Sequence, residues 1–410
     1  MSFRSAKTAF SRCTIVFSLL SLCCVLSACG GSQASVSQLS GSQIKGNSGQ
    51  ALHGGPPATT STLVKNPCAI TVDIAKWTNS ELAGQMLVTS ADIGSLQSAD
   101  KAVSSGVGGI VLMGNANSQD LKSEISSLVS KSPMGIRPLV MTDEEGGAIQ
   151  RLAELVGSMP WPRTMASSMT LAAVENMSYS VGLKMKNLGV NVDLAPVVDL
   201  DAGAGPSRTN PDGKRSFSPQ PLIAAEYAQR FMLGMIKAGV IPVMKHFPGL
   251  GQSSGNTDVM AAHTLPYQEL VSTGLVPFEK LKTMPAMVMV SNASVPGLSK
   301  GVPSSLSPKV MSILRSVVGF GGVVITDSLE TVSIQSYQPN ISKAVVDSAA
   351  AGADLIMLAS SNPNQFSVYS EARAALANAI LTNQISRPLA EQRVGQILEL
   401  KGVASSCIYY

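Results

Sequence analysis

Eight short apolar runs, separated by longer segments of helical periodicity, constrain the fold of this chain most strongly. The runs are rich in Val, Ile, Leu and Met, and they span residues 86–89, 109–113, 138–141, 192–198, 240–244, 286–290, 323–325 and 354–358. Continuous rather than alternating hydrophobicity indicates strands that are covered on both faces, as in parallel sheets. Between them, segments such as 221–238 and 341–351 place apolar residues at helical spacing. The pattern predicts an α/β fold, a single-domain (β/α)8 TIM-type barrel with some long loops.

An open doubly wound sheet is the alternative architecture. No Gly-rich dinucleotide fingerprint follows the first run, which argues against that alternative. We therefore favour the closed barrel, and we expect the protein to need no cofactor.

The first 28 residues have the features of an export signal. Arg4, Lys7 and Arg12 precede a mostly apolar stretch at 14–26, which is too short to span a bilayer. The sequence Leu-Ser-Ala-Cys-Gly at 26–30 resembles the lipobox of bacterial lipoproteins, which implies cleavage before Cys29 and lipidation of its thiol. An ordinary secretory peptide is the alternative. We expect an exported protein that is anchored by lipid to the outer face of the bacterial cell membrane.

The charge balance argues against nucleic acid as a partner. Removal of Arg4, Lys7 and Arg12 with the signal lowers the formal net charge from +4 to +1. The remaining sequence has no cluster of Lys and Arg that would follow a phosphate backbone. Attachment to the membrane is therefore expected to come from the lipid rather than from a basic patch.

The segment after the signal divides into a tether and a folded domain. Residues 29–66 are rich in Ser, Gly and Gln, which predicts a flexible tether, and residues 67–407 form the predicted barrel domain. Cys68 and Cys407 are the cysteines that remain beyond Cys29, and in an oxidising compartment we expect them to form a disulfide. Neither has a histidine near it in the sequence, so we predict no metal site.

Polar side chains follow five successive runs of the predicted barrel. They are Asp143, Glu144, Glu145 and Arg151 after the third run, Asp199 and Asp201 after the fourth, Lys245 and His246 after the fifth, Ser291 and Asn292 after the sixth, and Asp327 and Ser328 after the seventh. A single acid in such a position is often a helix N-cap, and Asp327 could be one. Together these residues predict a site, because the carboxyl ends of barrel strands converge on one mouth.

Paired carboxylates with several hydrogen-bond donors suit the hydrolysis of a glycosidic bond. A retaining enzyme uses an ionised carboxylate as nucleophile and a second group as acid and base. Asp143, Arg151, Arg215 and Lys245 would hold sugar hydroxyls through charge-assisted hydrogen bonds. We also expect Lys245 and Arg215 to lower the pKa of Asp327 and keep it ionised.

Five motifs together resemble glycoside hydrolase family 3, and most closely its single-domain β-N-acetylhexosaminidases of peptidoglycan turnover. They are Asp-Glu-Glu-Gly-Gly at 143–147 with Arg151, Ala-Pro-Val-Val-Asp at 195–199, Lys-Arg-Ser-Phe at 214–217, Lys-His-Phe-Pro-Gly at 245–249 and Val-Ile-Thr-Asp-Ser-Leu at 324–329. The resemblance implies a retaining mechanism with Asp327 as nucleophile. It also implies that Asp143, Arg151, Arg215, Lys245 and His246 bind the sugar, and we add Asp199 and Asn292 to these candidates.

The loop after Lys-His-Phe-Pro-Gly departs from the family pattern. These hexosaminidases usually continue with His-Gly and a loop that ends in Asp-Ser-His, whose His is the acid/base; here Leu250 replaces the first His, and the loop closes with Asn256-Thr257-Asp258. Three alternatives follow: Asp258 is the acid/base, His263 takes that role, or the role is weakened.

The sequence therefore predicts a retaining exo-glycosidase that removes terminal β-linked N-acetylhexosamine, with N-acetylglucosamine of peptidoglycan or a related glycan as the expected sugar. One alternative is a lipid-anchored binding protein for sugars or muropeptides, with weak or no catalysis. The other is a β-glucosidase-like or phosphorolytic specificity. The expected partners are a carbohydrate substrate and the lipid bilayer. The sequence does not fix the oligomeric state.

Overall fold

Eight parallel strands form a closed barrel in the computed structural model, which describes residues 71–116, 118–360 and 364–405. Around the barrel the strands are β2 (Leu87–Asp92), β3 (Gly109–Met113), β4 (Leu139–Thr142), β7 (Val192–Asp193), β8 (Ile241–Phe247), β9 (Met287–Val290), β10 (Val324–Thr326) and β11 (Ile356–Leu358). β11 pairs with β2, and a bridge between Ile325 and Leu355 joins β10 to the start of β11. The predicted barrel is confirmed.

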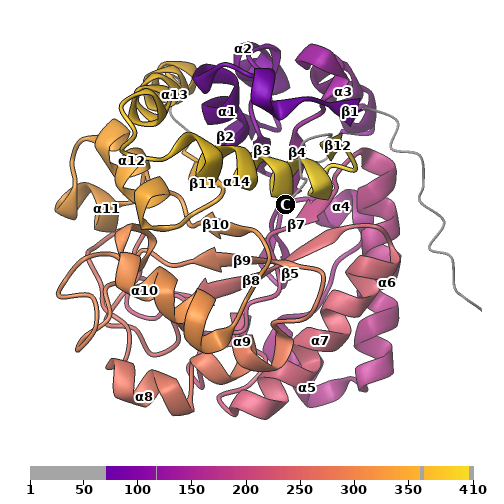
Figure 1. Ribbon diagram of the computed structural model, residues 1–410. Coiled ribbons are helices and arrows are strands. Elements are labelled where there is room, and N and C mark those ends of the chain that lie inside the picture. The colour runs from indigo at the N-terminus through magenta and orange to yellow at the C-terminus, as the bar shows by residue number, and fades with distance from the viewer. Residues whose placement is uncertain (1–70, 117, 361–363, 406–410) are drawn as a thin grey trace, which may run out of the picture. The chain divides into compact units, whose positions relative to one another are not determined.

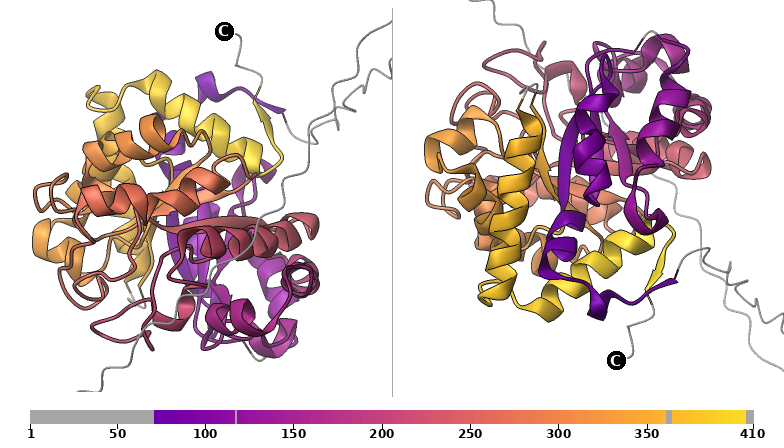
Figure 2. Two further views of the ribbon diagram at one scale, coloured as in Figure 1. Left: turned by 90° about the horizontal axis from the view of Figure 1, so that it is seen from below. Right: turned by 90° about the horizontal axis from the view of Figure 1, so that it is seen from above.

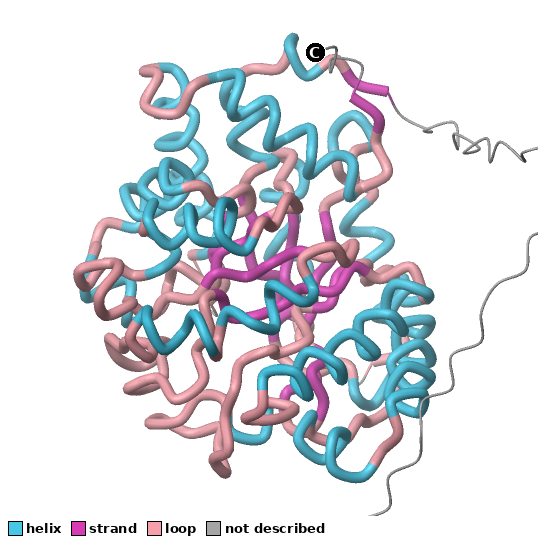
Figure 3. The backbone as a smooth tube through the Cα atoms, turned by 60° about the horizontal axis from the view of Figure 1, so that its bottom comes forward, coloured by secondary structure: helices cyan, strands magenta, loops and turns pink. Residues whose placement is uncertain are grey.

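Helices surround the barrel, as Figure 3 shows by the cyan helices outside the magenta strands. The α-helices are α1 (Asn79–Gln85), α2 (Asp100–Ser104), α3 (Leu121–Val129), α4 (Ala153–Val156), α5 (Pro162–Ser168), α6 (Leu171–Leu188), α7 (Pro221–Lys237), α8 (Tyr267–Ser272), α9 (Leu275–Leu281), α10 (Pro308–Ser312), α11 (Val332–Tyr337), α12 (Ile341–Ala351), α13 (Gln365–Leu381) and α14 (Arg387–Leu400). The shorter turns are η1 (Ile74–Lys76), η2 (Leu96–Ala99), η3 (Pro133–Gly135), η4 (Gly213–Arg215), η5 (Ser304–Leu306) and the π-helix η6 (Ile313–Val318).

Each predicted apolar run overlaps a barrel strand, and the strand residues are buried almost throughout. In the run at 192–198, only Val192–Asp193 forms a ladder. Pro196 lacks the N–H that a ladder needs. Val197 still forms an isolated bridge with Lys245, so the chain continues beside β8.

Two small strand pairs escaped the sequence prediction. β5 (Glu144–Gly146) and β6 (Ile149–Gln150) form an antiparallel hairpin directly after β4. β1 (Thr71–Val72) pairs in parallel with β12 (Ala404–Ser405), which joins the two ends of the described chain (Figure 2). Strands of two or three residues are too short to carry a periodic pattern.

Several calls from the sequence lie outside the described residues. These are the predicted signal peptide, the tether, lipidation of Cys29 and the disulfide between Cys68 and Cys407. Within the described ranges, no helix combines the length and the apolar character that crossing a membrane requires.

α6 and α7 pack closely side by side on the outside of the barrel (Figure 1), and Gly234 permits their approach. A Cβ atom at Gly234 would lie 2.0 Å from Ser178 Oγ and 2.4 Å from the carbonyl oxygen of Glu175 on α6. No real Cβ tolerates such distances to backbone, so a side chain here would push the two helices apart.

We predict that Gly234→Ala lowers the free energy of unfolding by about 3 kcal/mol, because overpacking a close helix contact costs that order of energy. Gly321→Ala is the matched control, since a Cβ there meets no atom within 4 Å. Its free energy of unfolding should change by less than about 0.5 kcal/mol. Urea denaturation measures both, and equal effects would contradict the packing argument.

Candidate active site

A cavity of about 280 Å³ opens at the carboxyl ends of the barrel strands. Its charged and polar lining comes from segments far apart in sequence: Asp143, Glu145, Arg151, Arg215, Lys245, His246, Asn256, Thr257, Asp258 and Asp327. Leu250, Met289 and Met357 contribute apolar wall. Convergence of the strand ends has therefore brought most of the predicted site residues into one mouth.

Lys245 of β8 links two acids that follow β4. Its Nζ donates to Asp143 Oδ1 at 2.9 Å and lies 2.6 Å from Glu145 Oε1, and its side chain is only 3% exposed. Arg151 Nη2 lies 3.7 Å from Asp143 Oδ2, and its buried Nε has no hydrogen-bond partner among the described residues. Asp143 and Arg151 thus border the cavity with hydrogen-bonding capacity left for a ligand.

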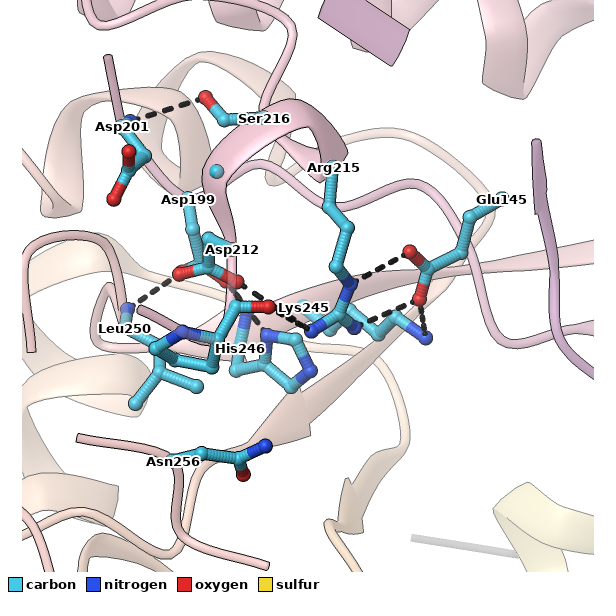
Figure 4. Close-up of polar contacts among 12 residues, drawn as sticks. Glu145, Asp199, Asp201, Asp212, Arg215, Ser216, Lys245, His246, Leu250 and Asn256 are labelled. Atoms are coloured by element: carbon cyan, nitrogen blue, oxygen red, sulfur yellow. Dashed lines mark hydrogen bonds and ion pairs between the residues drawn. The ribbon is translucent and has the colours of Figure 1, made fainter. Parts of the chain in front are cut away.

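Glu145 is one of the polar residues at the predicted mouth, but the sequence assigned it no role. Arg215 grips it with two parallel hydrogen bonds of 2.8 Å, from Nε to Oε2 and from Nη2 to Oε1 (Figure 4). Burial alone would raise the pKa of Glu145, but the charges of Arg215 and Lys245 outweigh burial and hold it well below its usual range. Glu145 is therefore ionised and orients both cations.

The alternation of side chains along Asp143, Glu144 and Glu145 could have indicated which of these acids face the cavity. In an extended strand, residues two apart point to the same side. Asp143 and Glu145 accordingly line the cavity, whereas Glu144 does not. Glu144 Oε1 accepts a hydrogen bond from the Leu152 backbone at 2.7 Å, and burial raises the pKa of Glu144 to about 7.

Asp199 orients His246 instead of facing the cavity. Its Oδ2 accepts the backbone N–H of His246 at 3.0 Å and lies 2.6 Å from His246 Nδ1, and its Oδ1 accepts the Leu250 N–H at 2.6 Å. Burial lowers the pKa of His246 to about 4, with Arg215 as the next cause, so the imidazole is neutral at neutral pH. Because Nδ1 is committed to Asp199, the other ring edge is left for the cavity.

Asp199, Asp212 and His246 each offer an atom within 4.8 Å of the others, which is a possible metal-ligand set. The positive charge there comes from the protein itself, since Arg215 Nη1 lies 3.7 Å from Asp212 Oδ1. Burial, followed by the charge of Asp199, raises the pKa of Asp212 to about 7, which lowers the charge a metal would meet. We therefore do not assign a metal to this cluster.

Asp327 follows β10 and lines the cavity together with Asp258. Its backbone N–H donates to the Val290 carbonyl oxygen at 2.9 Å, and its Oδ1 accepts the Ser328 N–H at 2.7 Å. The pKa of Asp327 is raised by burial first and by the charge of Asp258, although His246 and Lys245 act to lower it. The expectation of a lowered pKa was wrong, because burial of Asp327 together with the charge of Asp258 outweighs the effect of Lys245.

The loop that carries Asp258 is tied to neighbouring segments by its backbone. The carbonyl oxygens of Thr257 and Asp258 accept N–H groups from the start of α11, at 3.1 and 3.4 Å. Asn256 Oδ1 accepts the Asp258 N–H at 2.9 Å, while the Asp258 side chain is exposed. The loop therefore presents Asp258 at the cavity.

Besides Asp199, two further predicted site residues lie outside the cavity. His263 is exposed and does not line the cavity, and its Nδ1 lies 3.0 Å from the Thr264 carbonyl oxygen. Asn292 is buried below the mouth, where its amide donates to the Ser328 carbonyl oxygen at 2.6 Å. Asn292 thus supports the segment after Asp327, and we no longer expect it or Asp199 to contact a sugar.

Comparison with known proteins agrees with this geometry. The model of the glycosyl hydrolase family 3 N-terminal domain matches residues 80–400. The chain belongs to glycosyl hydrolase family 3.

Individual proteins of family 3 are also similar to this chain in sequence and structure. The chain is 35% identical to the beta-hexosaminidase LpqI of Mycobacterium tuberculosis over 259 residues, which cover 61% of this chain and 66% of that relative, slightly less than two thirds. A crystal structure of a family 3 glycosyl hydrolase from Mycobacterium smegmatis has a TM-score of 0.73 and 30% identity, and the match covers 80% of this chain and 98% of that one. A β-N-acetylhexosaminidase from Beutenbergia cavernae has a TM-score of 0.72 and 26% identity, with 80% and 100% covered.

We predict that Glu145→Gln lowers the free energy of unfolding by about 3–5 kcal/mol, because it leaves two buried cations without their shared anion. Glu144→Gln is the matched control. Its carboxyl has a pKa of about 7 and is protonated at pH 5, so an amide should replace it there at a cost below about 1 kcal/mol. Denaturant unfolding at pH 5 compares the two, and equal losses would contradict the assigned charge states.

Proposed function

We propose that this protein is a retaining exo-β-N-acetylhexosaminidase, with Asp327 as nucleophile and Asp258 as acid/base. The observation that carries the proposal is the meeting of these two carboxylates in one cavity, close enough that the charge of Asp258 raises the pKa of Asp327. Retaining glycosidases need two such groups on either side of the scissile bond.

In the first step, the ionised Asp327 attacks the anomeric carbon, and Asp258 gives its proton to the leaving oxygen. A covalent bond forms between Asp327 and the sugar as the glycosidic bond breaks. In the second step, Asp258 takes a proton from water, and the resulting oxygen nucleophile displaces Asp327 from the sugar. The anomeric configuration is retained because two inversions occur.

Asp143, Arg151, Arg215, Lys245 and His246 are proposed to hold the terminal sugar. All five line the cavity. Lys245 and Arg215 are already fixed by Glu145, so little side-chain entropy is lost when a hydroxyl binds them. The neutral His246 is held by Asp199 and keeps one ring edge free for a hydroxyl.

The substrate is proposed to be a terminal β-linked N-acetylglucosamine, from peptidoglycan or a related glycan. Support comes from relatives that are named as beta-hexosaminidases and from a structure titled as a family 3 β-N-acetylglucosaminidase of a Paenibacillus strain. The predicted export signal and lipid anchor at Cys29 would place this activity at the outer face of the bacterial cell membrane. One relative is described as a secreted glycosyl hydrolase.

Alanine variants assayed on chromogenic N-acetylglucosaminides test the roles. Asp327→Ala should reduce kcat by about 10³-fold or more, since the nucleophile is lost. Asp258→Ala should lose about 10²–10⁴-fold on substrates with poor leaving groups, less on activated ones, and should form a β-glycosyl azide with added azide. His263→Ala, as the control, should retain activity. Azide rescue of His263→Ala instead would assign the acid/base role to His263. Release by Asp327→Ala at the wild-type rate would exclude Asp327 as nucleophile, and a wild-type protein without Asp327-dependent release would be a binding protein.

The acid limb of the pH profile tests the coupling of the two carboxylates. Asp327 must be ionised to attack, and the charge of Asp258 raises its pKa. In Asp258→Asn that charge is gone, so the pKa of Asp327 falls and the acid limb of kcat/KM on an activated substrate should move to lower pH, by up to about one unit. An unmoved acid limb would contradict the coupling.

A further inference from the structure

A second cavity, of about 450 Å³, lies at the end of the barrel opposite to Asp327. Phe320 and Gly321 in its wall precede β10, and Gly352 and Asp354 precede β11, whereas Asp327 follows β10. The remaining wall comes from α10, α12 and α14, which are labelled in Figure 1, and from Arg315 of η6. This cavity therefore shares no residue with the proposed sugar site.

Two arginines and one carboxylate set the charge of this cavity. Arg315 Nη2 donates to Asp354 Oδ2 at 2.7 Å, and Arg393 Nε lies 3.5 Å from Asp354 Oδ1. Asp354 Oδ2 also accepts the Val324 N–H at 2.8 Å. The other lining side chains are uncharged, so the wall carries a net charge of +1.

Arg393 is not saturated by its partners. Its Nη1 donates to the Ala349 carbonyl oxygen at 2.7 Å, but its Nη2 has no acceptor among the described residues. The side chain is only 7% exposed, so bulk water solvates it poorly. Burial accordingly lowers the pKa of Arg393, because nearby Asp354 compensates the loss of solvent only in part. A buried guanidinium with one unpaired donor nitrogen, Nη2, at a cavity favours an anionic ligand.

The rest of the wall determines what kind of anion fits. Met311, Phe320 and Leu389 provide apolar surface, and Gln392 and Gln396 provide amides. The volume lies within the range of small-molecule sites, which are mostly apolar with a few placed polar groups. A net charge of +1 matches a monoanion with a hydrocarbon body better than it matches inorganic phosphate.

We propose that this cavity binds a small organic carboxylate, whose oxygens accept from Arg393 and whose hydrocarbon part contacts Phe320 and Leu389. The negative charge of the bound carboxylate, together with that of Asp354, would neutralise the two positive charges of Arg315 and Arg393. The site is independent of the proposed glycosidase activity, because it lies at the other end of the strands.

Calorimetric titration of the folded chain with hexanoate and benzoate tests the proposal, with hexanamide and inorganic phosphate as comparators. The carboxylates should bind, and hexanamide should bind at least about tenfold more weakly, since it lacks the charge. No binding of either carboxylate at 10 mM (about the weakest useful affinity) would overturn the proposal. Equal binding of hexanamide or tighter binding of phosphate would also overturn it.

Variants locate the binding. Arg393→Met and Arg393→Lys should each weaken carboxylate binding by at least about tenfold, because Lys cannot reproduce the guanidinium fork. Lys309→Met is the matched control: it removes an exposed positive charge from α10 that does not line the cavity, and binding should change by less than about twofold.

A blocking variant covers the case in which Arg393 variants do not fold. Leu389→Trp fills the mouth from a 38% exposed position and leaves both arginines in place, so it should abolish binding without lowering the unfolding temperature. Asp327→Ala should bind the carboxylate as the wild type does, which separates this site from the sugar site. Unchanged binding in Leu389→Trp, or displacement by N-acetylglucosamine, would overturn the proposal.

Discussion

The buried contact of Lys245 and Arg215 with Glu145 is the interaction on which the mouth of this barrel depends. Side chains from β5, β8 and η4 meet there, and none of them could be buried alone without a large desolvation cost. Glu145 fixes the two cations, and Lys245 in turn holds Asp143. The groups that we propose to bind the sugar are therefore held in place by contacts within the protein.

Lys245 and Arg215 are paired with Glu145, whereas Asp327 and Asp258 lie close enough for the negative charge of one to act on the other. Asp327 and Asp258 line the cavity without a strong ion pair of their own, and the pKa of Asp327 rises. A nucleophile with a raised pKa is more basic and hence a stronger nucleophile once it is ionised. In the proposed mechanism, the same division of charge that holds the sugar also sets the reactivity of Asp327.

The two ends of the barrel use the same chemical means for different purposes. At the mouth, Lys245 and Arg215 share Glu145, and Lys245 also reaches Asp143. At the other end, Arg315 and Arg393 share Asp354, which also accepts the Val324 N–H, and Nη2 of Arg393 has no acceptor among the described residues. In both places a buried carboxylate holds two cations beside a cavity.

The sequence by itself determined the barrel and the mouth, because continuous apolar runs require burial on both faces and parallel strands gather the residues at their ends. Asp143, Arg215, Lys245, His246, Asp258 and Asp327, which the sequence assigned to one site, line a single cavity in the structure. Only the tertiary structure decided which acid each cation faces, since that depends on contacts between β5, β8 and η4. For that reason the role of Glu145, the buried positions of Asp199 and Asn292 and the raised pKa of Asp327 were beyond the reach of sequence.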